Sequence, residues 1–190
     1  MTTGRLTLVF LLALAALPRP ASAFTPAEIT CRKTIASNVL RIEGVRSLSG
    51  GEWRIGPEHI EVASFIGLAA VTGADLTIED AAPEDLAPIL PVFERLGVRV
   101  EVTGTSVRVP PFQELVIRDD LGGQIAKIED GPWPAFPADL TSIALTVATQ
   151  ARGTILIFEK MLESRLFFVD KLVAMGARII LCDPHRAVVT

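Results

Sequence analysis

One order of structural elements occurs twice in this chain of 190 residues, and it constrains the fold more than any other feature. Each copy predicts a helix rich in small residues, a glycine and a strand, then an amphipathic helix, a second glycine and two strands joined by a turn. The first copy is predicted to consist of helices 58–71 and 84–96 and strands 73–79, 98–102 and 106–109. The second copy is predicted to consist of helices 139–150 and 163–175 and strands 153–159, 177–181 and 187–189.

The two kinds of helix in each copy predict how the copies pack. The first helix is apolar nearly all round, which is typical of a helix buried on most sides, whereas the second has one apolar stripe. The stripes are formed by Leu86, Ile89, Leu90, Phe93 and Leu96, and by Leu166, Val169, Leu172 and Val173. Units that cannot bury their apolar faces alone must stack on one another. We therefore expect an α/β domain with helices inside and sheets outside.

Two more strands, 39–45 and 52–55, are predicted before the first copy. At the other end, the last predicted strand runs to Thr190 with no element after it to close the array. The array of repeats is therefore expected to be unfinished.

Composition limits the classes of partner. The apolar fraction is 49%, and the net charge of −4 comes with no basic stripe, which argues against nucleic acid as a partner. Cys31 and Cys182 lie far apart without a CxxC motif, and His59 and His185 lack metal-ligand spacing, so no metal site is predicted. We expect both thiols to be inert and partly buried, and His59 to lie at the surface or in a helix cap.

The N-terminal residues resemble a secretory signal peptide. Arg5 precedes an apolar run, Leu6–Leu17, which is followed by Ala21-Ser22-Ala23. The run is too short for a comfortable membrane span, so no stable span is predicted. The alternatives are a buried or disordered leader, or an incorrect start of the gene. We predict a leader over 1–37 and a domain over 38–190, with repeat units at about 38–109 and 110–190.

The segment Pro134–Asp139 delivers a single carboxylate to the start of the apolar run 140–148. Proline fixes φ near its helical value and biases the residue before it to extended geometry. Asp139 is therefore predicted to lie in the first turn of a helix, where free N–H groups and the helix dipole favour a negative charge. It either caps the helix or forms a proton-accepting or substrate-orienting site.

Several segments in order carry a family resemblance. Arg54–Glu61 is similar to an R-x-x-P-D-x-I-E helix entry, and Pro134–Asp139 to P-x-F-P-T-D, with Ala138 in place of Thr. Glu159–Leu166 is similar to E-x-x-F-E-N-R-F, with Leu162 for Phe and Ser164 for Asn. Together with Arg41–Val45, they make residues 38–190 resemble the UDP-N-acetylglucosamine enolpyruvyl transferases, within the enolpyruvate transferase superfamily.

The resemblance implies a fold and a reaction. The family fold is a pair of inverse α/β barrels, or prisms, each built from three repeats, so this chain would form an incomplete prism. The family transfers the enolpyruvyl group of phosphoenolpyruvate to the 3′-hydroxyl of UDP-N-acetylglucosamine and releases phosphate, without a cofactor. This is a cytoplasmic step of peptidoglycan synthesis, and it would link the chain to cell wall biogenesis, cell shape, the cell cycle and cell division.

The resemblance also implies roles for three residues. Asp139 matches a catalytic aspartate that contacts the sugar hydroxyl and is implicated in its deprotonation. Met161 matches a position that touches the nucleotide sugar through its backbone and packing, and Arg165 matches an arginine near the substrate. The alternatives are a packed side chain for Met161, and for Arg165 a surface ion pair with Glu163 or Asp170.

The chain departs from the family pattern in ways that affect activity. A Lys-Asn pair that binds phosphoenolpyruvate, a mobile loop with a catalytic cysteine, and a C-terminal repeat with its arginine have no counterpart here, and neither Cys31 nor Cys182 has the matching context. We therefore expect no transferase activity from this chain alone. A truncated or frame-shifted reading frame is favoured over an exported derivative.

Two other functions stay open. One is an enzyme of the same superfamily that acts on shikimate 3-phosphate, against which the segment Phe136–Asp139 argues. The other is a non-catalytic repeat module that only binds a ligand or partner. An unfinished array would also expose apolar helix surface and favour association.

Overall fold

The computed structural model of the chain describes residues 32–33, 40–41, 52, 54–162 and 165–190. The chain separates into two units, one formed by residues 1–34 and 39–56 and the other by residues 35–38 and 57–190. In the first unit, β1 (Arg32–Lys33) pairs antiparallel with β2 (Leu40–Arg41). β2 falls within the predicted strand 39–45, whose other residues lie outside the described residues. The predicted leader also lies outside them apart from Arg32 and Lys33, and the boundary at 37/38 stays a prediction.

The second unit contains the repeat, and its two copies share one strand order. In the first copy the order is β3-β5-β4, and in the second copy β7-β9-β8 occur in the corresponding order, with antiparallel pairing throughout. The strands are β3 (Leu76–Ile78), β4 (Glu101–Thr103), β5 (Ser106–Val109), β7 (Ile155–Phe158), β8 (Ile179–Asp183) and β9 (Arg186–Val189). The predicted repeat is therefore confirmed as a repeat of topology.

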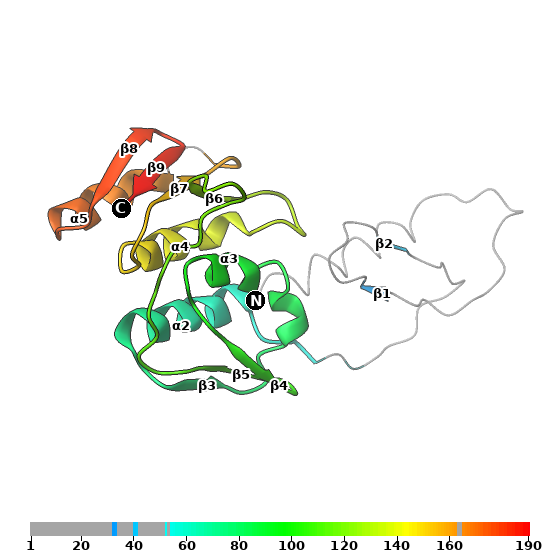
Figure 1. Cartoon of the computed structure of the whole chain (residues 1–190). Helices are drawn as coiled ribbons and strands as arrows, with labels where there is room; N and C mark the ends of the chain where they lie inside the picture. Colours follow the sequence, from blue (N-terminus) through cyan, green and yellow to red (C-terminus); the bar gives the residue numbers. More distant parts are fainter. Residues whose placement is uncertain (1–31, 34–39, 42–51, 53, 163–164) are drawn as a thin grey trace, which may run out of the picture. The chain divides into compact units, whose positions relative to one another are not determined.

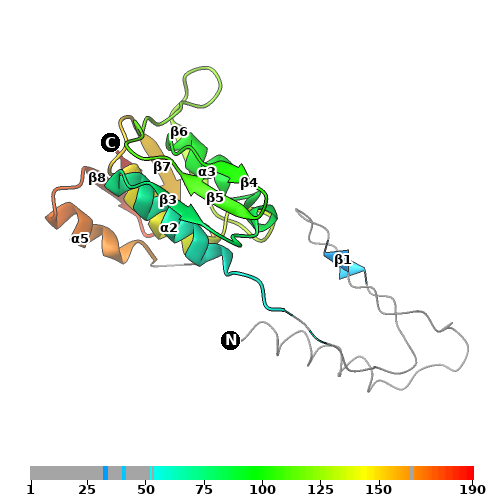
Figure 2. The ribbon, with the colours of Figure 1, turned by 90° about the horizontal axis from the view of Figure 1, so that it is seen from below.

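A fourth strand extends the second sheet and was missed by the sequence analysis. β6 (Ala126–Glu129) pairs parallel with β7, which gives the sheet order β6-β7-β9-β8. Parallel neighbours require a long crossover. Here the crossover contains the 3₁₀ turn η2 (Ala138–Leu140) and helix α4 (Thr141–Ala148). Figures 1 and 2 both show β6 and β7 side by side.

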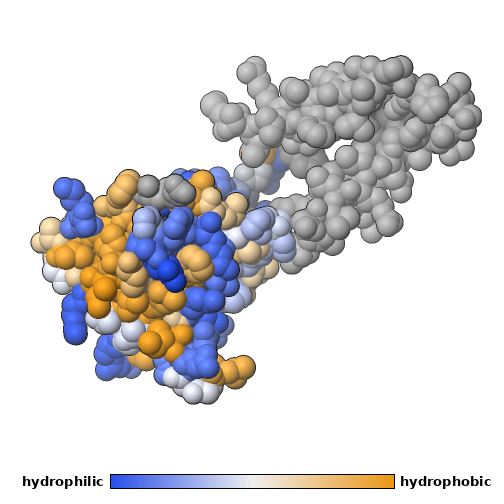
Figure 3. All heavy atoms as spheres, turned by 90° about the horizontal axis from the view of Figure 1, so that it is seen from above, coloured by the Kyte–Doolittle hydropathy of each residue, from blue (hydrophilic) through white to orange (hydrophobic). Residues whose placement is uncertain are grey.

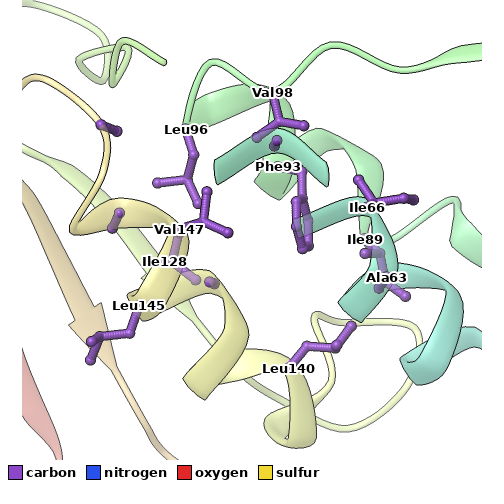
Figure 4. Packing of buried hydrophobic residues seen from close by; sticks show 14 of the residues in the cluster. Ala63, Ile66, Ile89, Phe93, Leu96, Val98, Ile128, Leu140, Leu145 and Val147 are labelled. Carbon is purple, nitrogen blue, oxygen red and sulfur yellow. The ribbon is translucent and has the colours of Figure 1, made fainter. Parts of the chain in front are cut away.

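Helices α2 (His59–Thr72) and α4 lie between the two sheets (Figure 1), as predicted. They pack closely because α2 has Gly67 at the contact, where a Cβ would lie 3.0 Å from Ile143 Cγ2. Glu58 caps α2 by accepting the Glu61 N–H at 2.8 Å, and Gly73 ends it at φ 67°. Figure 4 shows apolar side chains, Phe93 and Ile66 among them, in this interior. Both are fully buried.

The predicted amphipathic helices form in part as 3₁₀ turns. Helix 84–96 divides into η1 (Pro83–Leu86) and α3 (Leu90–Arg95), because Pro88 has no N–H to donate and Pro91 is favoured only in a first turn. The first two residues of helix 163–175 lie outside the described residues, and the rest forms η3 (Arg165–Phe168) followed directly by α5 (Val169–Ala174). The stripes nevertheless point inward: Leu86, Ile89, Phe93, Leu96, Leu166 and Val169 are buried.

Other expectations were wrong in detail. The predicted strand 52–55 is not found at Glu52, Arg54 or Ile55, which have no regular structure. Cys182, expected to be partly buried, is an exposed thiol on β8, and Cys31 lies outside the described residues. Val173 of the second stripe is 45% exposed.

His59 lies where it was predicted, at the surface near a helix cap. It begins α2, and its ring lies 3.4 Å from the carboxylate of the cap residue Glu58.

Apolar surface is exposed on the side of the four-stranded sheet, where Figure 3 shows a broad hydrophobic area. The exposed large apolar residues of α5 and β8 are Val173, Ile180 and Leu181, and Met175 follows α5. Leu68 of α2 is also 54% exposed, so α2 is not covered all round by the described residues. Among the described helices, none combines the length and the hydropathy needed to cross a membrane.

The buried stripe of α3 should dominate the stability of the second unit. Phe93 is fully buried, so Phe93→Ala is expected to lower the free energy of unfolding by about 3–5 kcal/mol. Phe167→Ala is the matched control, because Phe167 is 74% exposed and should change stability little. Urea unfolding followed by circular dichroism measures both. Equal losses for the two variants would contradict the proposed core.

Gly97 is expected to be required for steric reasons, beyond its backbone conformation. Its φ is 85°, and an added Cβ would lie 2.4 Å from the backbone N of Val116. Gly104 is the control, since its φ is 59° but nothing lies within 4 Å of an added Cβ. Both Gly→Ala variants should lose about 1–2 kcal/mol from the left-handed backbone, and only Gly97→Ala should lose more through the clash. Thermal unfolding measures both variants. Equal losses of stability in Gly97→Ala and Gly104→Ala would show that Gly97 does not closely approach Val116.

Candidate functional site

Asp139 is presented where the sequence analysis placed it, but it does not cap the helix. Pro137 lies at φ −64° and ψ 134°, in extended geometry, and ends the proline-rich segment. η2 starts with the next residue and continues into α4, and it has no side-chain cap hydrogen bond. The Asp139 carboxylate is thus not engaged by the backbone of its own helix and is turned to another partner.

That partner is Arg165, the first residue of η3. Arg165 Nη1 lies 2.5 Å from Asp139 Oδ1, and the two side chains are 42% and 54% exposed. This pairing replaces one predicted alternative, an ion pair between Arg165 and Asp170, and the other proposed partner, Glu163, lies outside the described residues. A half-exposed pair is screened by water and salt and stabilises a fold by only about 0–1 kcal/mol. Both charges therefore remain available to a ligand.

Met161 lies in the connection between β7 and η3, upstream of Arg165. Met161 is 48% exposed, so it is not part of the buried core, and the choice between a packed side chain and a ligand contact stays a prediction. Its backbone N–H donates to Asp130 Oδ2 at 3.2 Å. The structure thus pairs two of the predicted site residues, Asp139 and Arg165, and places the backbone of Met161 against Asp130.

A pocket of about 520 Å³ opens beside the Asp139–Arg165 pair. Its polar groups come mainly from α4, with Arg165 and the buried carboxyl of Glu159 completing the lining. The residues that line it are Ala138, Thr141, Ser142, Ile143, Thr146, Glu159, Arg165, Leu166 and Phe168. Thr141 Oγ1 is buried and has no hydrogen-bond partner among the described residues. The pocket therefore offers hydroxyl groups and one guanidinium to a polar ligand.

Glu159 is the unexpected member of this lining. It is fully buried, and neither carboxyl oxygen accepts a hydrogen bond from an N–H or hydroxyl group of the described residues. Burial, followed by hydrogen bonding to Asp130 and repulsion from its charge, raises the pKa of Glu159 to about 7, against smaller opposing effects of Thr141 and Arg165. Below neutral pH this group is therefore largely a neutral acid.

No role was predicted for Glu159 or for Asp130, which is 3% exposed. A signal for Glu159 was present in the alternation of its strand, because Ile155 and Ile157 are buried and the next residue on that face is Glu159. An acid at the end of a buried strand face is unusual. Asp130 had no comparable signal because β6 itself was not recognised.

A second hollow of about 460 Å³ lies between α3 and β6. Its charged side chains pair with one another: Arg95 lies 3.0 Å from Asp120, and Lys127 lies 2.9 Å from Glu129. No group of His, Cys, Asp and Glu side chains suited to a metal ion occurs in the part of the chain that the structure describes. The pocket beside Asp139 is therefore the stronger candidate site.

Comparisons with known proteins identify the family. Residues 25–184 match the family model described as EPSP synthase (3-phosphoshikimate 1-carboxyvinyltransferase). The chain is 56% identical to a UDP-N-acetylglucosamine 1-carboxyvinyltransferase of Treponema denticola over 82% of this chain and 37% of that protein. It is 57% identical to the protein of the same name from Bradyrhizobium diazoefficiens, over 82% of this chain and 36% of that protein.

A solved structure gives the same result for the fold. The enolpyruvyl transferase NikO from Streptomyces tendae matches with a TM-score of 0.58 and 26% identity, over 71% of this chain and 30% of that chain. The chain spans little more than a third of the length of the curated relatives it matches. The expected mixed α/β fold, as an incomplete domain of the enolpyruvate transferase type, is therefore confirmed. Sequence motifs, strand topology and family match together show that the chain belongs to the family of enolpyruvyl transferases.

Proposed function

We propose that this chain supplies the sugar-side part of a UDP-N-acetylglucosamine 1-carboxyvinyltransferase site. The observation that carries the proposal is the Asp139–Arg165 pair at the edge of a pocket that contains hydroxyl groups, on segments similar to those of the named relatives. In this reaction the 3′-hydroxyl oxygen bonds to the enol carbon of phosphoenolpyruvate while the methylene carbon gains a proton. Loss of a proton from that carbon and of phosphate then restores the double bond.

Asp139 is the base in this proposal. Its carboxylate is half exposed and already oriented by a cation, so it can accept the proton of the hydroxyl group as the C–O bond forms. Arg165 orients Asp139 in the free chain and can turn to a phosphate or carboxylate when substrate binds. Met161, which is half exposed, would contact the nucleotide sugar through its backbone and packing. The acid that protonates the methylene carbon is expected from elsewhere in a complete enzyme.

The proposed setting follows from the substrates. UDP-N-acetylglucosamine and phosphoenolpyruvate are cytoplasmic, so we propose a cytoplasmic step of peptidoglycan synthesis that supports cell wall biogenesis, cell shape and division. No cofactor and no nucleic acid is part of the proposal. The alternative substrate is shikimate 3-phosphate, which the name of the family model includes. The names of the curated relatives at 56–57% identity favour the sugar nucleotide.

Binding of UDP-N-acetylglucosamine should depend on the charge of Asp139. Asp139→Asn keeps the shape but removes the charge, so we expect affinity to fall about tenfold or more, as for the loss of a charged hydrogen bond. Asp75→Asn is a closely matched control, because Asp75 pairs with Arg108 at 2.9 Å and the side chains of that pair are 51% and 42% exposed. Isothermal titration calorimetry measures both variants, with shikimate 3-phosphate as the competing ligand. Equal losses in the two variants, or tighter binding of shikimate 3-phosphate, would contradict the proposal.

The chain alone should bind without turnover. A phosphate-release assay with both substrates is expected to show no activity, because the groups expected to donate the proton and hold phosphoenolpyruvate have no counterpart in this sequence. Turnover that survived stringent purification and disappeared in Asp139→Asn would overturn this expectation. A folded chain that bound neither substrate would instead support the non-catalytic repeat module.

A further inference from the structure

The parallel pairing of β6 and β7 brings two acids together at one edge of the sheet. The register aligns Ala126 with Ile155 and continues to Glu129 opposite Phe158, so the residues that follow the two strands are Asp130 and Glu159. Paired residues point to the same face, and the face alternates along each strand. Ile128 and Ile157 point into the core, and so, two residues further, do Asp130 and Glu159. An apolar row of the sheet thus ends in a buried pair of carboxyl groups.

Backbone N–H groups bind the carboxylate of Asp130. Its side chain accepts hydrogen bonds from the N–H groups of Lys160 and Met161, the latter at 3.2 Å. Its own N–H donates to Phe158 O at 3.4 Å, and the next residue, Gly131, donates to Phe136 O at 3.1 Å. Asp130 therefore contacts the connection that carries Met161 and begins the segment that leads to Asp139.

Glu159 fits beside this carboxylate only as a neutral acid. A second buried charge without a donor would be costly, whereas a protonated Glu159 can donate its O–H to Asp130. Its backbone is held from the other side, where the Glu159 N–H donates to His185 O at 2.8 Å and His185 Nδ1 lies 3.0 Å from Glu159 O. The titratable and charged groups around the acid are thus Asp130, Arg165 and His185, with the hydroxyl of Thr141 completing its surroundings.

We propose that Asp130 and protonated Glu159 form a positioning pair that fixes the backbone of Lys160 and Met161 relative to the segment carrying Asp139. The positioning role rests on the proposed function, whereas the pair itself does not. While Glu159 holds its proton, the Asp130 carboxylate binds the backbone N–H groups of Lys160 and Met161. Loss of that proton places two negative charges in one buried site and loosens this stretch of backbone. The pair makes the geometry of the site dependent on pH.

The direction of the pH dependence follows from the raised pKa of Glu159. The stability that the neutral acid contributes is complete below the ordinary pKa of 4.5 and is lost as pH rises to about 7. The urea midpoint of the unaltered chain should therefore fall between pH 5 and pH 8. Glu159→Gln keeps a donor for Asp130 but has no proton to lose, so its midpoint should fall less. Any slope common to both proteins belongs to titratable groups other than Glu159.

The backbone amides report the pair directly and without a ligand. In NMR spectra of the full chain recorded from pH 5 to pH 8, the amide signals of Lys160 and Met161 should shift along one titration curve near neutral pH. The same signals should not follow that curve in Glu159→Gln. Identical curves in both proteins, or no titration of these amides in the unaltered chain, would overturn the pair.

The positioning role is tested by ligand binding. Asp130→Asn can accept fewer amide hydrogen bonds and has no charge, so affinity for UDP-N-acetylglucosamine should fall about tenfold at pH 6, with Asp75→Asn as the control. In the unaltered chain affinity should weaken from pH 6 to pH 8, and Glu159→Gln should remove that dependence. A pH-dependent affinity that persists in Glu159→Gln would overturn the positioning role. If the unaltered chain binds no sugar nucleotide, the proposed function fails, while the amide titration still decides the pair.

Discussion

The parallel pairing of β6 with β7 is the constraint on which the candidate site depends. It requires a crossover, and that crossover contains the proline-rich segment, η2 and α4, so Asp139 is placed at the start of an inner helix. The same pairing ends in Asp130 and Glu159, and Asp130 binds the backbone of Lys160 and Met161. The antiparallel strands β8 and β9 then complete the sheet, and their turn binds the backbone of Glu159 through His185. Each site residue is thus positioned through one strand pair.

The interior of the unit follows from helices with few large side chains. At its contact with α4, α2 has Gly67. Even a methyl group at this position would come too close to Ile143, with its carbon 3.0 Å from Ile143 Cγ2. Such close contact gives many dispersion interactions between backbones that are held by their own hydrogen bonds. Polar residues of α4 can line the pocket because other residues of this helix, Ala144 and Leu145 among them, are buried in the core.

Much of the fold could be predicted from the sequence, because periodicity and glycine positions recur in both copies. The elements that were missed or misjudged have specific causes. Pro88 and Pro91 interrupt a stripe whose burial is nevertheless as expected. β6 spans only Ala126–Glu129, with one strongly apolar residue, Ile128, so its pattern was too short to recognise. In the candidate site, Asp139, Met161 and Arg165 were predicted from motifs. The ion pair between Asp139 and Arg165, and the pair formed by Asp130 and Glu159, depend on tertiary contacts that no local pattern contains.

Two aspartates separated by a short proline-rich segment have different surroundings, and these decide what each can do. Asp130 is buried and bound by backbone amides, so water cannot replace its hydrogen bonds and the segment it begins is held in place. Asp139 is half exposed, and water or a ligand can replace its one ion pair at little cost. A site that binds and releases a ligand needs both kinds of carboxylate. A carboxylate that exchanges its partner for a ligand acts reproducibly only when its own backbone is fixed. The Gly131–Phe136 hydrogen bond joins the fixed aspartate to the segment that presents the exchangeable one. The physical basis for a functional Asp139 therefore lies as much in Asp130 as in Asp139 itself.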